Sequence, residues 1–496
     1  MKLALKDLPL CNSFSQLGED FFARVSPSPF RKPARLVHYN PRAGELLDLH
    51  PQQQEQDLVD VLSGNRLLPG SDPIAMLYAG HQFGHYVPQL GDGRAIMLGE
   101  TRNTTGQAWE IQLKGSGHTP FSRDGDGRAV LRSTIREYLC SEAMHGLGIP
   151  TTRALCITGS DEEIYREQIE TGAMLTRLAP SHIRFGSFEV FYYRNQFEQL
   201  QQLADFVIRQ HYPELADCDN PYAELLAAVI ERTAALIAQW QGVGFCHGVM
   251  NSDNMSILGI TIDYGPFGFM QAFDPGYICN HSDHRGRYAY DKQPEIGLFN
   301  LSCLAQALLP LLHEDVDEAV EIAKQSLQQY KSRYVHHYAN IMRKKLGLQQ
   351  IHDTDQALVT GLLNLMARDK LDFSILFRNL CTFSCENDAA NTTIRDLFIN
   401  REAFDAWAQE YRQRLQLENS ADSERAIAMK RTNPKFILRN YMAELAIRKA
   451  EDDRDYSEID KLLTILHSPF DEHNGHAAYA GLPPDWAGQI SVSCSS

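Results

Sequence analysis

The chain has 496 residues, enough for two to four domains or for one large domain with extensions. Hydrophobic residues make up 43% and charged residues 22%, as is ordinary for a soluble globular protein. The formal net charge of −16 argues against a nucleic-acid partner, because phosphate backbones need a basic face. It does not argue against nucleotide binding, for which a few local arginines, lysines and metal ions suffice.

The N-terminus and the cysteines bear on the cellular compartment. The first residues carry acids early and lack a long apolar run, so we expect no secretory signal. No stretch of about 18 consecutive apolar residues is present, so the sequence predicts no membrane partner. The 10 cysteines are scattered without metal-ligand pairs, which favours a reducing compartment, and we expect a cytoplasmic protein.

Residues 1–80 are predicted to form an N-terminal extension, with a Pro-rich segment (SPSPFRKPARLV) and a short helix-like run (GELLDLH). His81 and His85 follow, four residues apart. Gly84 lies between them and no Glu follows His81, so the spacing does not match a zincin site. We therefore expect hydrogen-bonded packing for these histidines rather than metal ligation.

A glycine turn (GDGR, 91–94) opens a predicted strand at 95–98, and a turn at 103–106 leads to a second strand at 108–114. Apolar and polar residues alternate cleanly in the second strand, which Lys114 closes. Glycines let a backbone approach phosphates closely. A glycine turn, a hairpin and a lysine at the strand end are the layout of a protein-kinase N-lobe, although each feature alone is a weak signal.

A helix is predicted over residues 128–145, after the loop GSGHTPFSRDGDG. Asp126 and Gly127 are expected to cap its start, where free N–H groups and the helix dipole favour anions. Glu137 lies in the middle of this helix, 23 residues after Lys114. A kinase pairs its strand lysine with a glutamate of the following helix, and the order of the motifs predicts the ion pair Lys114–Glu137 here.

Two further strands are predicted at 154–158 and 173–178, separated by a polar turn (SDEEIYREQIETG). The next segment stands where a kinase has an apolar slot for adenine, but Arg177 and Arg184 occupy it. Guanidinium groups fit phosphate oxygens far better than a purine edge. With Arg94 in the glycine turn, they indicate a nucleotide turned end for end; the alternative is that these arginines pair with surface acids.

The stretch GFCHGVMNSDNMSILGITIDYGPFG, from 244 to 268, carries a metal-binding pattern. Asn254 is followed, nine residues later, by Asp263-Tyr264-Gly265, and a protein kinase holds its metal with such a pair. Amide and carboxylate oxygens suit a metal that shares its shell with waters and phosphates. Two residues after His247, where a kinase has its catalytic Asp, this chain has Val249, which cannot accept a proton.

The rest of the chain is predicted to be mainly helical, with amphipathic helices at 198–212 and 221–241. Together these features predict an α+β, protein-kinase-like bilobal fold with N-terminal and C-terminal extensions. The expected parts are an extension at 1–80, an N-lobe at 81–178, a helical C-lobe at 179–340 that includes an activation segment at 263–295, and a helical C-terminal extension at 341–496 with a redox-capable tail.

Seven motifs spread over nearly the whole length resemble the selenoprotein O family of bacteria and mitochondria. They are YAGHQFG, QLGDGRA, IQLKGSG, HGVMNSDNMSILG, DYGPFGF, NPKFILRNYM and the terminal CSS. Eukaryotic members carry selenocysteine near the C-terminus, and this chain has Cys494 there.

The resemblance implies a protein-kinase-like fold that acts as a nucleotidyltransferase. ATP would bind inverted, and AMP would pass to Ser, Thr or Tyr hydroxyls of target proteins while pyrophosphate leaves; UMP transfer from UTP is also attributed to the family. The motifs imply that Asn254 and Asp263 hold Mg²⁺ or Mn²⁺ and that Asp253 accepts the proton, unless Asp253 only binds metal or holds the loop. The residues implied for nucleotide binding are Gly91, Gly93, Arg94, Lys114, Asp126, Gly127, Arg177, Arg184 and Asp263.

Two alternative functions stay open at this point. The first is a conventional kinase, although Val249 and the arginines count against it. The second is a catalytically dead pseudokinase scaffold, although the intact lysine, glutamate and metal-ligand positions count against that.

The state of Cys494 is open as well. It could form a disulfide with Cys279 of the expected activation segment and restrict substrate access, or it could be a free thiol.

Overall fold

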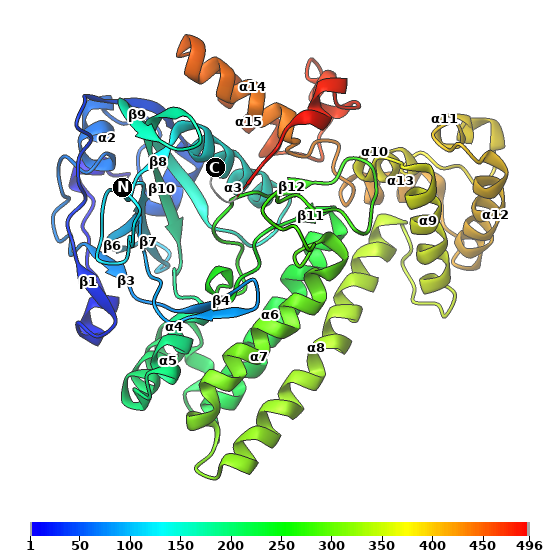
Figure 1. Ribbon diagram of the computed structural model, residues 1–496. Coiled ribbons are helices and arrows are strands. Elements are labelled where there is room, and N and C mark those ends of the chain that lie inside the picture. Colours follow the sequence, from blue (N-terminus) through cyan, green and yellow to red (C-terminus); the bar gives the residue numbers. More distant parts are fainter. Residues whose placement is uncertain (1, 494–496) are drawn as a thin grey trace.

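The computed structural model describes residues 2–493 and shows an α+β protein built around an eight-stranded antiparallel sheet (Figure 1). The strand order is β1-β3-β6-β7-β10-β9-β2, and β8 pairs with β10. These strands are β1 (Phe22–Arg24), β2 (Ala34–Tyr39), β3 (Ile74–Met76), β6 (Ala95–Arg102), β7 (Ala108–Lys114), β8 (Ala129–Val130), β9 (Arg153–Tyr165) and β10 (Ile169–Ala179). Two small hairpin-like pairs stand apart, namely β4 (Gly80–Gln82) with β5 (His85–Val87) and β11 (Phe245–Cys246) with β12 (Gly268–Phe269).

The alternation predicted for β7 is confirmed, and it gives the sheet two distinct faces. Ile111 and Leu113 are buried in a cluster with Ala43 of helix α1 (Pro41–Gly44) and with Leu58 and Leu62 of helix α2 (Glu55–Leu62). Lys114 closes the strand on the other side and faces a large cavity. Side chains that alternate across a strand therefore separate a dry core from a polar site.

The β9–β10 hairpin is longer than predicted, because most of the expected polar turn is strand. Its polar residues alternate between buried and exposed positions up to Tyr165. Glu162 and Glu170 are buried, and each pairs with an arginine of the segment before or within α3, at 3.5 Å from Arg128 and 3.0 Å from Arg132. Charged residues can occupy buried strand positions when they are paired, although their polarity alone would predict a turn there.

Residues before position 80 supply both edges of the sheet. β1 and β3 form one edge beside β6, and β2 forms the other beside β9. The sheet therefore crosses the boundary expected at residue 80.

Helix α3 (Leu131–Gly146) packs on β9 and β10 and is covered on its other side by the end of the chain (Figure 1). Helices α14 (Asn440–Arg448) and α15 (Ser457–Leu466) both pack on it. Within this contact Glu142 accepts two hydrogen bonds of 2.8 Å from Arg153 and lies 3.0 Å from His467 Nε2. Burial raises the pKa of Glu142, but these partners reverse the effect and hold it far below its usual value.

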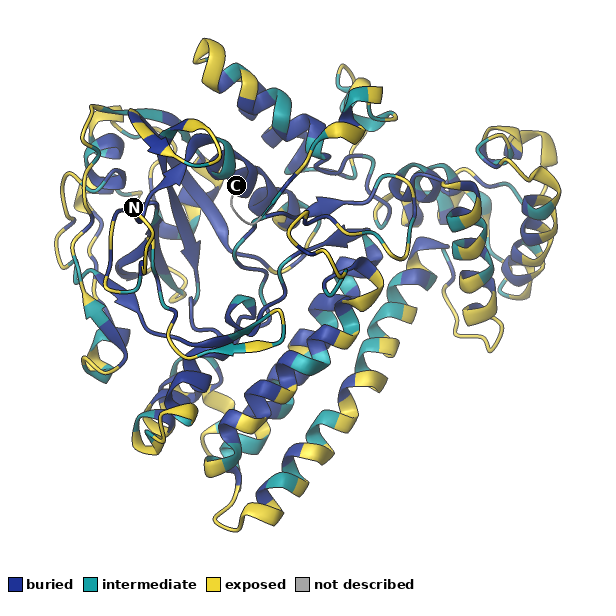
Figure 2. Cartoon of the chain, in the orientation of Figure 1, coloured by how far each residue is buried: buried dark blue, intermediate teal, exposed yellow. Residues whose placement is uncertain are grey.

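The helical part of the molecule contains α4 (Phe185–Tyr193), α5 (Phe197–His211), α6 (Pro221–Gly242), α7 (Gln293–Leu312) and α8 (Val316–Lys345). The two amphipathic helices predicted from the sequence are thus confirmed as α5 and α6. Figure 2 shows α6 and α7 largely buried and α8 exposed along much of its length.

One described helical stretch, Tyr290–Leu312, is long and apolar enough to cross a membrane by length and composition, although polar residues interrupt its apolar run. Its most apolar window is 56% buried inside the protein. The helix packs against α4, α6 and α8, so its apolar faces have protein partners.

A second hydrophobic core lies around the end of α8 and the helices α9 (Asp355–Asp369), α10 (Phe373–Leu380), α11 (Thr392–Arg395), α12 (Arg401–Leu417) and α13 (Asp422–Lys430). Lys345 is buried in this region, with Nζ 4.4 Å from the centre of the Phe377 ring and 5.3 Å from that of Phe373. Burial lowers the pKa of Lys345 to about 7. Among the described residues, these two aromatic rings are the only groups that form a cation–π contact with the Lys345 ammonium.

Candidate active site

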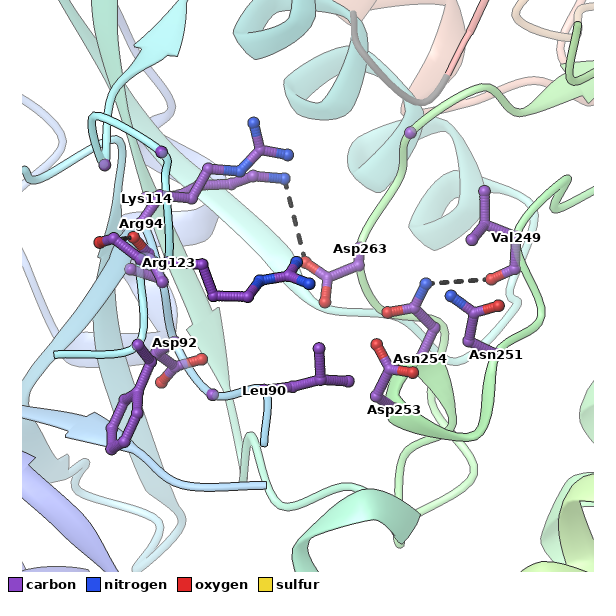
Figure 3. A pocket seen from close by; sticks show the side chains of 18 of the residues that line it. Leu90, Asp92, Arg94, Lys114, Arg123, Val249, Asn251, Asp253, Asn254 and Asp263 are labelled. Carbon is purple, nitrogen blue, oxygen red and sulfur yellow. Dashed lines mark hydrogen bonds and ion pairs between the residues drawn. The ribbon is translucent and has the colours of Figure 1, made fainter. Parts of the chain in front are cut away.

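A cavity of 680 Å³ lies between the sheet and the segment that follows β11 (Figure 3). The glycine turn at 91–94 and the loop at 121–128 form one wall, and the segment from 249 to 266 forms the opposite wall. All the residues predicted to bind the nucleotide or the metal line this space, as does the predicted proton acceptor Asp253: Gly91, Gly93, Arg94, Lys114, Asp126, Gly127, Arg177, Arg184, Asp253, Asn254 and Asp263.

Asp263 is the point on which the cations of the cavity converge. Its Oδ1 lies 2.7 Å from Arg177 Nη2 and its Oδ2 lies 2.7 Å from Arg184 Nη1. Lys114 Nζ approaches Oδ1 at 3.9 Å. Burial raises the pKa of Asp263, but the charges of these three groups outweigh it and hold the pKa well below its usual value. Asp263 is therefore a carboxylate at any physiological pH.

Asp263 also has a left-handed backbone, with φ of 57°. Two other non-glycine residues that line the cavity share this conformation, Phe83 with φ of 50° and Arg123 with φ of 53°. Non-glycine residues adopt the left-handed region at a cost, and such residues gather at functional sites.

Glu137, in the middle of α3, links the two strand cations from behind. Its Oε2 lies 2.5 Å from Lys114 Nζ, and its Oε1 lies 2.7 Å from Arg177 Nε. Burial lowers the pKa of Lys114 to about 8, and the charge of Arg177 adds to this effect, while Glu137 opposes it. One glutamate thus fixes a β7 side chain and a β10 side chain against the same helix.

Arg184 directly precedes α4 and ties it to the opposite wall. Its Nη1 donates to the Asp253 carbonyl at 2.9 Å as well as to Asp263. Its guanidinium lies over the Tyr78 ring, 4.5 Å from the ring centre. The segment between Asn254 and Asp263 forms two isolated bridges, Ser256 with Arg184 and Thr261 with Thr151.

Asp253 lies in a 3₁₀ turn, Ser252–Asn254, and its carboxyl group is nearly enclosed. Gln82 donates to Oδ2 at 3.1 Å, while the buried Oδ1 has no hydrogen-bond partner among the described residues. A Cβ at Gly80 would lie 2.6 Å from that Oδ1, so only glycine permits this approach. Burial raises the pKa of Asp253 to about 6, and the bond from Gln82 limits the rise.

Asn254 is held with its amide nitrogen turned away from the cavity. Nδ2 donates to the Val249 carbonyl at 3.0 Å, which leaves the amide oxygen for another partner (Figure 3). Neighbouring Asn251 fixes the loop itself, because its Oδ1 accepts from Tyr288 Oη at 2.6 Å.

The glycine turn is shaped by close contacts. Gly91 has φ of 127°, and a Cβ there would lie 2.5 Å from Cγ of Phe121. Asp92 is buried beneath the turn, where Oδ2 accepts from the Met76 amide at 3.1 Å and from Gln112 at 3.3 Å. The Asp92 carboxylate therefore holds the turn in place.

The cap expected from Asp126 is wrong. α3 begins at Leu131, because β8 pairs with β10 first and Val130 takes the N-cap position without a side-chain bond. Asp126 instead accepts from the Arg128 amide at 2.9 Å and pairs with Arg166 at 2.8 Å.

Sequence reasoning missed Arg123, which extends its guanidinium into the cavity toward Asp263 (Figure 3). Within residues 2–493, no carboxylate lies at ion-pair distance from Arg123 or from Arg94. Arg94 could be found from its place in a glycine turn. Arg123 stands in an equally glycine-rich loop, SRDGDG, and the same signal applied there would have found it.

Comparison with known proteins identifies the family of this chain. A family model described as "Protein adenylyltransferase SelO" matches residues 5–467. This chain belongs to the SelO family. Protein nucleotidyltransferase YdiU of Thiobacillus denitrificans is 57% identical over 493 residues, covering 99% of both chains. The proteins of the same name from Myxococcus xanthus and Thioalkalivibrio sulfidiphilus are each 54% identical over 493 residues, again covering 99% of both chains.

Cys279 of this SelO-family chain lies behind the cavity loop, not in the cavity. It is buried, and its thiol donates to the Cys246 carbonyl at 3.4 Å. The tail passes nearby, because the His281 amide donates to the Val492 carbonyl at 3.0 Å. Cys494 lies outside the described residues, so its link to Cys279 stays a prediction.

Proposed function

We propose that this chain is a protein adenylyltransferase that binds ATP with its phosphates at the inner end of the cavity and transfers AMP to Ser, Thr or Tyr hydroxyls of other proteins. One observation carries the proposal: Arg177, Arg184 and Lys114 converge on Asp263 at the end of the cavity nearest the sheet. Guanidinium forks at this place favour phosphate oxygens and disfavour a purine.

The fold on which we place this activity is a protein-kinase-like bilobal one. Residues 81–178 would form its N-lobe and residues 179–340 its C-lobe, with an activation segment at 263–295. The ion pair from Lys114 to Glu137 and the Asn254–Asp263 pair across one cavity support this proposal. Residues 1–80 and 341–496 would be extensions that share the cores of both lobes.

Two further cations face the same cavity. Arg177 and Arg184 are already paired with Asp263, whereas Arg94 and Arg123 line the cavity with no carboxylate at ion-pair distance within the described chain. An unpaired guanidinium that faces a cavity is a fitting partner for a phosphate. We assign Arg94 and Arg123 to nucleotide binding on this ground.

The donors present fit a hard divalent cation. Asn254 keeps its amide oxygen available because its nitrogen is engaged by Val249. Each Asp263 oxygen accepts from one guanidinium and retains a lone pair, since a carboxylate offers about four acceptor positions. Asn254 and Asp263 would hold Mg²⁺ or Mn²⁺, which supplies charge neutralisation for triphosphate oxygens when bound.

The reaction needs a proton acceptor, and Asp253 fits that role. Its unpaired Oδ1 and a pKa of about 6 leave it mainly ionised at neutral pH yet basic enough to take a proton. The acceptor hydroxyl oxygen would bond to the α-phosphorus as its proton passes to Asp253. The bond from the α-phosphorus to the bridging oxygen breaks, and pyrophosphate leaves with that electron pair. Arg177, Arg184 and Lys114 offset the negative charge that develops.

Labelled nucleotides test the proposal. The protein is incubated with a protein substrate mixture and ATP labelled at either the α- or the γ-phosphate, with α-labelled UTP in parallel. We expect label on protein from α-labelled ATP only, or also from UTP, and its loss in Asp263→Ala. Transfer of the γ-label instead would mean a kinase, and no transfer of either label would mean a scaffold; both outcomes refute the proposal.

A further inference from the structure

A cluster of nitrogen, oxygen and sulfur donors lies beneath the turn that carries Asp253, outside the cavity already described. His81 comes from β4, Glu189 from α4 and Cys303 from α7. One donor atom of each lies within 4.8 Å of the other two. Three separate elements therefore bring together the side-chain types that transition metals prefer.

The glutamate of this cluster is only half satisfied. Its side chain is fully buried, and Oε2 lies 2.6 Å from His81 Nδ1. The other oxygen, Oε1, is buried without a hydrogen-bond partner among the described residues. A buried carboxylate oxygen without a partner costs free energy, and a cation removes that cost.

Aromatic rings enclose the histidine and fix its plane. The ring centres of Tyr86, Tyr193 and Phe299 lie 5.3, 6.1 and 5.8 Å from that of His81. Only 13% of the His81 side chain is exposed, which leaves a narrow route from solvent. Such a dry surrounding strengthens the bond between a ligand and a metal.

We propose that His81, Glu189 and Cys303 form a site for a Zn²⁺ ion, with a fourth position left for water. Three protein donors of the types N, O and S, drawn from three elements, fit tetrahedral zinc and not the six oxygens that Mg²⁺ requires. A carboxylate and a thiolate together cancel the charge of Zn²⁺, so the filled site carries no net charge into the interior.

No sequence motif marks this site, because its members lie 108 and 114 residues apart along the chain. His85, which lies four residues after His81 in the sequence, is not part of this cluster. The hydrogen-bonded packing expected for His81 is confirmed by its contact with Glu189, and that same contact places it in the cluster.

The site is connected to the catalytic turn through the backbone of β4. The His81 amide donates to Ser252 Oγ at 2.7 Å, and the next residue, Gln82, donates to Asp253. A zinc ion that joins β4 to α4 and α7 would hold Gln82 and the turn Ser252–Asn254 at fixed positions. The ion is thus a positioning element, distinct from the Mg²⁺ or Mn²⁺ proposed at Asn254 and Asp263.

Cobalt substitution tests the proposal on the full-length protein under reducing conditions. Co²⁺ bound in a tetrahedral site with a cysteine ligand gives a thiolate-to-cobalt charge-transfer band and intense visible bands, which cobalt in an oxygen-only site lacks. We expect one equivalent of Co²⁺ to produce these bands and one equivalent of Zn²⁺ to abolish them. The Asp263→Asn variant should keep them, because the catalytic site contains no sulfur.

Matched variants locate the ligands. Cys303→Ser and His81→Gln should each lose the charge-transfer band or shift it strongly, and should weaken Zn²⁺ binding at least 10-fold by competition with a chromogenic chelator. Cys218→Ser and His85→Gln, both at exposed positions, are the controls and should bind as the parent does. Circular dichroism shows whether each variant is folded. Because the two substituted ligands come from different elements, the test still works if one of the variants fails to fold. No band in the parent protein, or an unchanged band in both ligand variants, overturns the proposal.

Discussion

Replacement of Gln82 by Leu tests whether Asp253 acts as the proton acceptor. The Gln82 amide is the only side-chain donor to the Asp253 carboxyl group among the described residues, at 3.1 Å from Oδ2. This bond stabilises the carboxylate and limits the rise in pKa that burial causes. Leu is similar in size and donates nothing, so the pKa of Asp253 should rise further above 6 in the variant.

The size of the shift follows from the strength of one hydrogen bond to a charged group. Such a bond contributes about 1.5 kcal/mol, which is about one pH unit. The acid limb of the transfer rate should therefore move from a midpoint of about 6 to about 7. At pH 6 the ionised fraction of Asp253 falls from about a half to about a tenth, so the rate should fall about fivefold relative to the parent. Above about pH 8 the two profiles should converge.

The assay is the initial rate of α-label transfer at saturating ATP from pH 5 to 9. Gln199→Leu is the control, because Gln199 donates to Asp20 at 3.0 Å in the same kind of pair but on the surface, far from the cavity lining. Ionisation of the nucleotide and of the acceptor protein affects parent, variant and control alike. If the acid limb of Gln82→Leu coincides with that of Gln199→Leu, Asp253 does not titrate in the rate-limiting step and the assignment is wrong.

Three further predictions concern buried groups. Asp253→Asn should abolish transfer yet raise the free energy of unfolding by up to about 3 kcal/mol at pH 7, because a carboxyl group whose folded pKa is raised destabilises the fold above that pKa. Denaturant titrations should show this gain in stability at pH 7 and its loss near pH 4. Lys345→Met should raise the free energy of unfolding by at most about 5 kcal/mol below pH 7, and by less as the pH rises toward 10, because the lowered folded pKa disfavours the charged amine. Lys344→Met, at an exposed position, is the control, and equal effects of the two substitutions would contradict the reasoning. Oxidant should produce a disulfide between Cys279 and Cys494 that peptide mapping detects and that slows transfer, and a map without this link ends the idea.

Much of the fold could be predicted because its cause is local. The strand at 108–114 and the helices at 198–212 and 221–241 follow from periods of two and about 3.6 residues, which a single segment displays. The β9–β10 hairpin could not be predicted to its full length. The polarity of Glu162 and Glu170 predicts a turn, because the arginines that neutralise them come from other elements and cannot be identified from the local sequence.

The candidate site divides in the same way. Lys114 and Asn254 stand in short motifs with known spacing, so their place in the cavity could be expected. The paired contacts of Arg177 and Arg184 with the two oxygens of Asp263 depend on how β10, α4 and the loop after β11 meet, which no local pattern specifies. The glycine-rich loop around Arg123 could have marked it as a candidate, but its left-handed backbone and inward direction are visible only in the structure.

The edges of the sheet have a consequence for how this chain is made. β3 and β2 emerge from the ribosome before β6 and β9, the inner strands that they border, and Ala34 of β2 can pair with Ser160 of β9 only after that residue is made. Pairing between segments so distant in sequence is slow, and unpaired strand edges invite contact with other chains. The first 80 residues thus wait the longest during translation for their partners in the sheet, until the hairpin of β9 and β10 has formed.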